Sequence, residues 1–139
     1  MTHWLYEGQP FESDMIGDYV GFVYLITNLE NDKKYIGKKW FWSTKKLPPL
    51  KGKKRKRTVV KESDWKQYYG SSEEVKLLLE QLGKDNFKRE ILRLCKTKGE
   101  CSYYELVEQI EREVLIKPDE YYNGIIQCKI HRSHILPKL

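Results

Sequence analysis

The sequence has few cysteines and no long apolar run. Its three cysteines are odd in number and spread over 139 residues, unlike the even, closely spaced framework of a disulfide-stabilised secreted domain. No apolar run approaches the roughly 20 residues that span a membrane. The first residues lack the basic start and apolar core of a signal peptide. These absences predict a soluble protein of the cytoplasm.

The charge that is present is concentrated in one segment. The chain carries a net charge of +6, and residues 38–66 hold twelve Lys or Arg against two Asp or Glu. That segment therefore has a charge of +10 and leaves −4 on the rest of the chain. A basic segment on a slightly acidic body predicts a face that binds a polyanion, with nucleic acid as the first candidate. The length and the 13% of aromatic residues indicate one domain, residues 1–139, with a modest core.

A β-hairpin is predicted near the start of the chain. Phe22–Ile26 is apolar and rich in β-branched or aromatic residues, and Lys34–Lys38 returns after a turn that contains Asn and Asp. Tyr24 and Tyr35 then lie eleven residues apart on different strands, which brings them near one another. Gly37 lets backbone or a phosphate approach closely. On spacing alone, two half-buried strand tyrosines with a structural role are the simpler interpretation.

The remaining segments predict a mixed set of elements. Residues 1–20 form an irregular lead-in, and residues 43–63 form a basic insertion. Two prolines exclude a continuous helix in the insertion, and we expect a mobile loop because the like charges from Lys53 to Arg57 repel one another. Ser71 and Glu74 match a capping box for a helix that ends at Gly83. Further on, the pattern predicts a strand at Phe87–Leu94, a helix at Tyr103–Ile116 ended by Pro118, a short final strand, and a basic tail over residues 124–139.

Several short motifs occur in an order that resembles the GIY-YIG nuclease superfamily, in particular its phage-borne members, which include free-standing homing enzymes. The motifs are Val23-Tyr24, Tyr35-Ile36-Gly37, Tyr69-Gly70-Ser71-Ser72, the segment Leu82–Phe87, Glu105, and Tyr122-Asn123. The resemblance covers about Gly21 to Asn123.

The resemblance implies an α+β fold, with a small three-stranded, mainly antiparallel sheet flanked by helices and a basic insertion after the hairpin. It implies a divalent-metal-dependent DNA endonuclease, possessing Mg²⁺ or Mn²⁺ as cofactor and acting on duplex DNA in the cytoplasm of a phage host. Compared with longer members, we expect no appended DNA-recognition domain. Target choice would then depend on the insertion, the lead-in, a homodimer or a phage or host partner.

The resemblance also implies roles for individual residues. Tyr24 and Tyr35 orient or deprotonate the attacking water, Glu105 holds the metal ion, and Asn123 supports the site. Gly37 and Lys38 complete the catalytic set. Hydrolysis of a phosphodiester needs an activated water and a cation that offsets the charge building on the phosphoryl oxygens. Tyr24 as a general base needs a nearby cation to lower its pKa, and Lys38 or Lys39 is close enough in sequence to supply one. The expected DNA-binding residues are Lys39, Lys45, Lys46, Lys53, Lys54, Arg55, Lys56, Arg57, Ser71 and Ser72.

Two departures from the family pattern leave alternatives open. The family's arginine is absent from its usual place, which Lys45-Lys46 occupies. Arg55 or Arg57 could approach the site instead, or Lys38 or Lys39 could substitute as a point charge, although lysine lacks the bidentate fork of arginine. The same predicted helix carries two other candidates for the metal carboxylate, Glu108 and Glu111. A catalytically impaired nucleic-acid-binding module on the same fold is therefore the alternative function.

A third hypothesis is a small protein that binds structural zinc. Its candidate ligands are Cys128, His131 and His134, with Cys95 or Cys101 as a fourth. The three-residue spacing is unfavourable on a strand, because residues three apart point to opposite faces.

Overall fold

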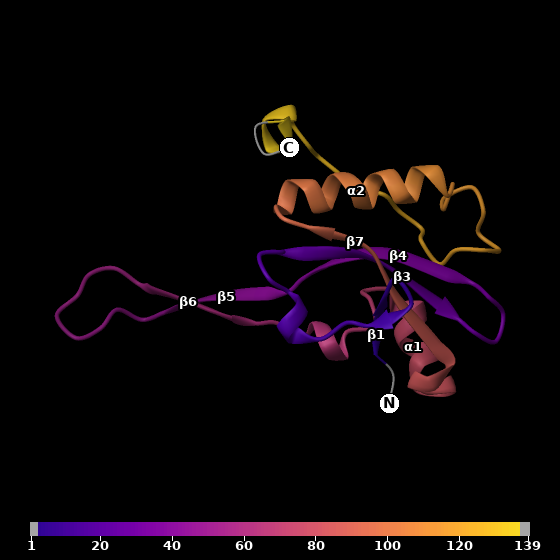
Figure 1. Cartoon of the computed structure of the whole chain (residues 1–139), viewed down its shortest axis with the longest axis horizontal. Helices are drawn as coiled ribbons and strands as arrows, with labels where there is room; N and C mark the ends of the chain where they lie inside the picture. The colour runs from indigo at the N-terminus through magenta and orange to yellow at the C-terminus, as the bar shows by residue number, and fades with distance from the viewer. Residues whose placement is uncertain (1–2, 137–139) are drawn as a thin grey trace.

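The fold is organised around a mixed five-stranded sheet (Figure 1). The computed structural model describes residues 3–136, except for the side chain of His134. The strand order is β2-β1-β7-β3-β4, from β1 (Trp4–Tyr6), β2 (Gln9–Pro10), β3 (Gly21–Asn28), β4 (Lys34–Trp40) and β7 (Phe87–Cys95). β3 lies antiparallel to both β4 and β7, whereas β1 pairs with β7 in parallel. β4 is thus an edge strand.

The predicted α+β class is confirmed, and the predicted three-stranded sheet is wrong in its strand number. The three predicted strands are present as β3, β4 and β7, but the lead-in that we expected to be irregular supplies β1 and β2. Trp4 in β1 is only 2% exposed, and its Nε1 donates to the Trp65 carbonyl at 2.6 Å. A strand of three residues is too short to show a hydrophobic period in the sequence.

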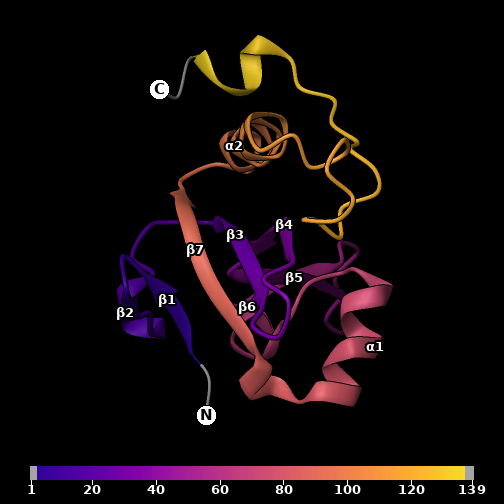
Figure 2. The ribbon, with the colours of Figure 1, turned by 90° about the vertical axis from the view of Figure 1, so that its right-hand side faces the viewer.

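Two helices lie on opposite faces of the sheet, α1 (Glu73–Leu82) and α2 (Lys98–Glu111) (Figure 2). Successive residues of β3 point to alternate faces. Tyr24 and Ile26 join the α1 side of the core, and Val23 and Leu25 join the α2 side. All eight residues of β3 are buried, because both faces are covered. β3 therefore carries the core on both sides.

Both predicted helices are present with different ends. The N-cap of α1 is Ser72 rather than Ser71, and its hydroxyl accepts from the Val75 N–H at 3.3 Å. α2 begins five residues before the predicted start, because Thr97 caps it by accepting from the Glu100 N–H at 3.0 Å. It also ends well before Pro118, since the chain leaves the helix at Arg112. Apolar periodicity alone did not locate these caps.

The basic insertion forms a second, two-stranded sheet of β5 (Trp42–Leu47) and β6 (Arg57–Glu62). This pairing differs from the unpaired loop that the sequence predicted, because β-branched residues at 58–60 pair across from 44–46. The hairpin projects from the rest of the molecule (Figure 1). Residues 42–62 are called the arm.

The remaining elements are short. They are the 3₁₀ helices η1 (Ser13–Met15), η2 (Trp65–Gln67), η3 (Lys84–Asn86) and η4 (Arg132–His134). The predicted final strand is wrong for residues 124–136, which contain no strand, and the predicted basic tail extends to 137–139, outside the described residues. Within residues 3–136 no helix has the length and apolar character needed to cross a bilayer.

The buried position of Trp4 predicts that the lead-in is part of the folding unit. Trp4→Ala should lower the free energy of unfolding by about 3–5 kcal/mol, through lost burial and the cavity left behind. Trp42→Ala is the matched control, because Trp42 is 40% exposed and lies in the arm. We expect that change to cost under about 1 kcal/mol. Urea denaturation followed by circular dichroism measures both, and equal costs would contradict the assignment of β1 to the core.

Candidate active site

A missing side chain on the edge strand makes room for a buried tyrosine. Tyr24 of β3 pairs directly with Gly37 of β4, and Tyr24 is only 1% exposed. A Cβ atom on Gly37 would overlap the phenol oxygen of Tyr24 and the ring carbon that bears it. The sequence predicted that Gly37 admits backbone or phosphate, whereas in the structure it admits the Tyr24 phenol. The phenol thereby lies across β4 at the edge of the sheet.

Tyr35 lies beside Tyr24, as the hairpin predicted. Their ring centroids are 6.3 Å apart, and the Tyr35 hydroxyl lies 3.1 Å from Ser71 Oγ. Gly70 approaches both rings with a φ of +93°, and a Cβ there would lie 3.5 Å from the Tyr24 oxygen and 3.5 Å from Tyr35 Cδ2. The turn before α1 therefore closes over both tyrosines.

Tyr68 is a site residue that the sequence analysis missed. Its ring packs edge-on against Tyr24 with centroids 5.9 Å apart. Lys39 Nζ lies 4.2 Å from the Tyr68 ring centroid and 2.6 Å from Asp64 Oδ1. The adjacent motif Tyr69-Gly70-Ser71-Ser72 was the available signal. It pointed to this turn, but not to the residue just before it.

Glu105 is the carboxylate that α2 brings to β4. Its Oε1 lies 3.5 Å from Lys38 Nζ, and Lys38 also donates to Ser102 Oγ at 2.9 Å. The Glu105 side chain is 16% exposed. The two alternatives have other surroundings: Glu108 forms ion pairs with Arg93 and Arg112, and Glu111 is exposed.

Burial dominates the electrostatics of the site. It raises the pKa of Tyr24 well above the ordinary value of a tyrosine, and the nearby Tyr68, Tyr35 and Glu105 raise it further. Burial also raises the pKa of Tyr35, against a hydrogen bond to Ser71 that lowers it. The sequence predicted that Lys38 or Lys39 would lower the pKa of Tyr24. In the structure, however, Lys38 contacts Glu105 and Lys39 contacts Asp64. Both phenols are therefore neutral at physiological pH.

The same competition applies to the Glu105 carboxyl. Burial raises its pKa, and the positive charge of Lys38 together with a hydrogen bond from it lowers that pKa. Lys38 thus keeps a partly buried carboxylate compensated.

Asn123 acts on the edge strand. Its Oδ1 accepts from the Ile36 N–H at 3.0 Å, and its Nδ2 donates to the Ile36 carbonyl at 2.8 Å. The buried Asn123 amide therefore replaces a neighbouring strand for the residue between Tyr35 and Gly37. The predicted supporting role takes this form: Asn123 holds β4, the strand on which the site is built.

The predicted DNA-binding residues fall into separate places. Lys39 contacts the Tyr68 ring, Ser71 contacts Tyr35, and Ser72 caps α1. The others lie in the arm: Lys45, Lys46, Lys53, Lys54, Arg55, Lys56 and Arg57. Arg57 donates to the Pro48 carbonyl at 3.3 Å within the arm. Lys38 is the cation that contacts the Glu105 carboxylate.

The donor set at the site fits a hard divalent ion. Within residues 3–136, no group of three or more His, Cys, Asp or Glu side chains gathers as a closed metal site would require. Glu105 offers one carboxylate, and Mg²⁺ keeps several waters and binds through one or two carboxylates. Of the candidate zinc ligands, Cys128 donates to the Ser102 carbonyl at 3.6 Å, and the His134 side chain lies outside the described part.

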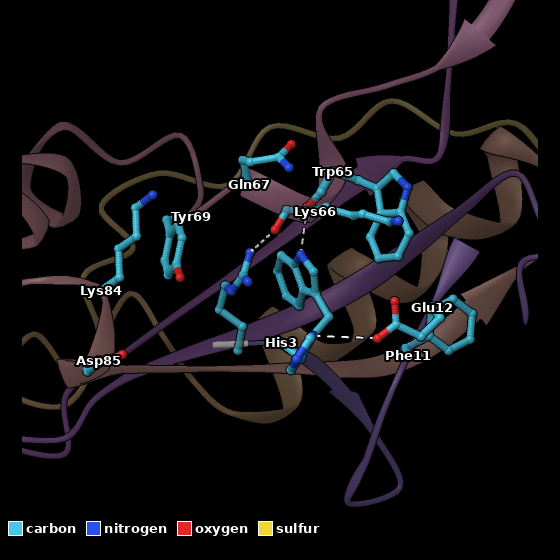
Figure 3. Close-up of a pocket in the computed structure, with 11 residues that line it drawn as sticks. His3, Phe11, Glu12, Trp65, Lys66, Gln67, Tyr69, Lys84 and Asp85 are labelled. Carbon is cyan, nitrogen blue, oxygen red and sulfur yellow. Dashed lines mark hydrogen bonds and ion pairs between the residues drawn. The ribbon is translucent and has the colours of Figure 1, made fainter. Parts of the chain in front are cut away.

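A cavity of about 440 Å³ lies beside β1, with Trp4, Trp65 and Arg89 among the residues that line it (Figure 3). Arg89 stands in its wall and stacks on Trp4 and Tyr69, with its guanidinium carbon 4.7 Å and 4.0 Å from their ring centroids. Arg89 also donates to the carbonyls of Lys66 and Tyr68 at 2.9 and 2.8 Å. Arg89 therefore fixes the segment that carries Tyr68.

Comparisons with known proteins identify the family of the chain. A family model described as "Putative endonuclease segE, GIY-YIG domain" matches residues 4–126. A protein named "Putative endonuclease segE", from Enterobacteria phage T4, is 37% identical over 102 residues, which cover 73% of this chain and 39% of that protein. The chain thus spans about two fifths of the length of this relative. No solved structure matches. The resemblance inferred from the motifs is confirmed.

The contact between Gly37 and Tyr24 gives a test of the site's geometry. Gly37→Ala should displace the Tyr24 phenol and lower the free energy of unfolding by about 1–3 kcal/mol, as overpacking does. Gly124→Ala is the control, because a Cβ there meets no atom within 4 Å. Chemical denaturation gives the energies, and tyrosine fluorescence and absorbance report the displaced ring. A neutral Gly37→Ala with unchanged spectra would contradict this packing.

Proposed function

The chain belongs to the segE-type GIY-YIG endonuclease family, and from that membership we propose that it is a divalent-metal-dependent DNA endonuclease. The reaction is hydrolysis of phosphodiester bonds in duplex DNA. One observation carries the proposal, which is that three groups flank the same edge strand: the Tyr24 phenol packs on Gly37 of β4, Tyr35 of β4 lies beside Tyr24, and Glu105 of α2 contacts Lys38 of β4.

Glu105 is the proposed ligand of Mg²⁺ or Mn²⁺. When bound, such an ion offsets the negative charge that builds on the phosphoryl oxygens. The Glu105 side chain faces Lys38 and is 16% exposed, so an ion can reach it from solvent. With an ion held by Glu105, Lys38 would be available to a phosphate oxygen. We propose that it takes the place of the family's arginine as a point charge, without the bidentate fork.

The tyrosines are proposed to position the attacking water. Because burial raises the pKa of Tyr24, its phenol is neutral and serves as a hydrogen-bonding group rather than a pre-formed base. Tyr35 is oriented through Ser71 Oγ, 3.1 Å from its hydroxyl. Tyr68 packs against the Tyr24 ring and limits its movement. Positioning of this kind requires a rigid scaffold, and Asn123 supplies it by holding Ile36.

The wider setting follows from the same comparisons. The relative comes from a phage, which supports action in the cytoplasm of a phage host, and a free-standing homing role fits a phage endonuclease. A single centre of this kind cuts both strands of a duplex through two copies of the chain or through two sequential nicks. We propose one nuclease domain over residues 1–139, with the arm as its basic insertion.

Plasmid cleavage tests the function. Purified protein should nick supercoiled plasmid with Mg²⁺ or Mn²⁺ and should not nick it with EDTA. Tyr24→Phe and Glu105→Gln should each lower the rate by about 100-fold or more, since each removes a group that acts at the reacting phosphate. Glu111→Gln is the matched control, because it makes the same change at an exposed position of the same helix.

The outcomes separate the competing functions. Binding of plasmid without nicking under either ion would indicate the catalytically impaired binding module. Full activity of Glu105→Gln would move the metal site to another carboxylate. Retained cleavage in EDTA would overturn the metal dependence.

A further inference from the structure

We propose that the arm lies in the major groove of duplex DNA beside the cleaved phosphate, with one particular face toward the base pairs. This inference rests on the proposed function for its DNA partner, and it adds a binding mode and a specificity-determining surface. It follows from the register of β5 and β6, from the charge of each face, and from the way the arm is anchored.

The two faces of the arm differ in charge. Residues paired directly across the hairpin share a face, and successive residues alternate. One face carries Ser43, Lys45, Leu47, Arg57, Val59 and Lys61, and the other carries Trp42, Thr44, Lys46, Thr58, Val60 and Glu62. The first, called here the cationic face, holds three positive charges and no acid. The second, called the neutral face, holds one lysine and one glutamate.

The arm gains little from the rest of the protein. Ser43, Leu47 and Glu62 are half-buried, and the other strand residues are exposed, including Val60 at 59%. A two-stranded hairpin with both faces open is marginally stable in water. The segment 43–61 also holds nine Lys or Arg and no Asp or Glu, so its own charges repel one another. A polyanion that covers the cationic face relieves this repulsion.

The dimensions of the arm select the groove. Two paired strands are about 4.8 Å apart, and with side chains such a ribbon fits the major groove of B-DNA, about 12 Å wide, but not the minor groove, about 6 Å wide. Lysine and arginine recognise the N7 and O6 atoms of guanine there. Lys45, Arg57 and Lys61 occupy that position when the cationic face is inward. The five cations between the strands, at positions 51 and 53–56, then lie near phosphates.

The base of the arm is fixed to the catalytic strand. The Ser63 N–H donates to the Phe41 carbonyl at 2.8 Å, and Ser63 Oγ donates to the Trp40 carbonyl at 2.7 Å. Phe41 and Trp65 are fully buried beside these bonds, with ring centroids 5.1 Å apart. β4, which carries Tyr35, Gly37 and Lys38, therefore continues into the arm through a rigid joint. Because of this joint, the duplex whose phosphate lies at the site is also the duplex whose major groove holds the arm.

The chain length sets how far the contact reaches. Leu47 lies ten positions after Gly37, and at about 3.3 Å per residue this length of strand spans at most about 33 Å. With a base-pair rise of about 3.4 Å, that distance corresponds to about 10 base pairs. Protection by the arm strands should therefore lie within about 10 base pairs of the cut and on one side of it.

Two adjacent lysines provide the test. Lys45 and Lys46 are both exposed and adjacent in β5, so Lys45→Ala and Lys46→Ala remove one positive charge each from neighbouring positions. The two variants differ in the face of the arm that loses the charge. We expect Lys45→Ala and Lys61→Ala each to weaken binding to a 30-base-pair duplex by about 10-fold, and Lys46→Ala by about twofold, since it loses only long-range attraction. Fluorescence anisotropy in EDTA measures binding without cleavage, and thermal unfolding checks that each variant folds.

Chemical footprinting provides a second readout. With the full chain bound in EDTA, dimethyl sulfate should fail to methylate guanine N7 atoms on one side of the cut, and Lys45→Ala should restore methylation. Equal losses for Lys45→Ala and Lys46→Ala would overturn the face assignment. Unprotected N7 atoms would overturn the major-groove placement. A single strand bound as tightly as the duplex would overturn the duplex partner.

These results are independent of catalysis. If no metal ion supports nicking but the lysine difference and N7 protection are present, the proposed function fails and the arm assignment stands. If plasmid is nicked but the two lysine variants bind alike, the arm assignment fails and the nuclease stands.

Discussion

The absence of a side chain at Gly37 is the constraint on which the site depends. β4 is an edge strand, and a Cβ at this position would occupy the place of the Tyr24 phenol. Without it, a tyrosine from the fully buried strand β3 reaches across the sheet edge. Tyr35 then lies beside Tyr24, and the Ser71 hydroxyl, from the turn before α1, contacts Tyr35. One small residue thus gives the phenol of a core tyrosine a place against the edge strand.

The edge position also explains why residues from both layers take part. α2 covers the sheet face opposite the tyrosines. The negative charge of Glu105 on α2 nevertheless contributes to raising the pKa of Tyr24 and of Tyr35. Asn123 makes this geometry possible. An edge strand exposes backbone groups on one side, and the Asn123 amide satisfies the N–H and the carbonyl of Ile36.

The sequence predicted the parts of the site that depend on local pattern. Alternation and turn residues predicted the hairpin, and the hairpin brought Tyr24 and Tyr35 together. Tyr68, β1 and the helix caps were missed because their roles arise from tertiary contacts. Trp4 is buried by a strand distant in sequence, and Tyr68 is held by Arg89 through two backbone carbonyls. The arm was predicted as a basic segment, but its pairing was not, because like charges outweighed the β-branched signal at residues 58–60.

Lys38 links the resting protein to its proposed reaction. A half-buried carboxylate without a partner costs several kcal/mol, so Glu105 needs a cation at all times. Lys38 supplies it, 3.5 Å away, and Ser102 Oγ fixes the ammonium at 2.9 Å. In the proposed reaction, Glu105 would hold the divalent ion, and Lys38 would be free to contact the phosphate. Because a lysine has three rotatable donors on a flexible stem, it can change partner without moving β4. Such an exchange would let a site with a lysine beside its carboxylate, rather than the family's arginine, remain stable without metal and still present a positive charge to DNA.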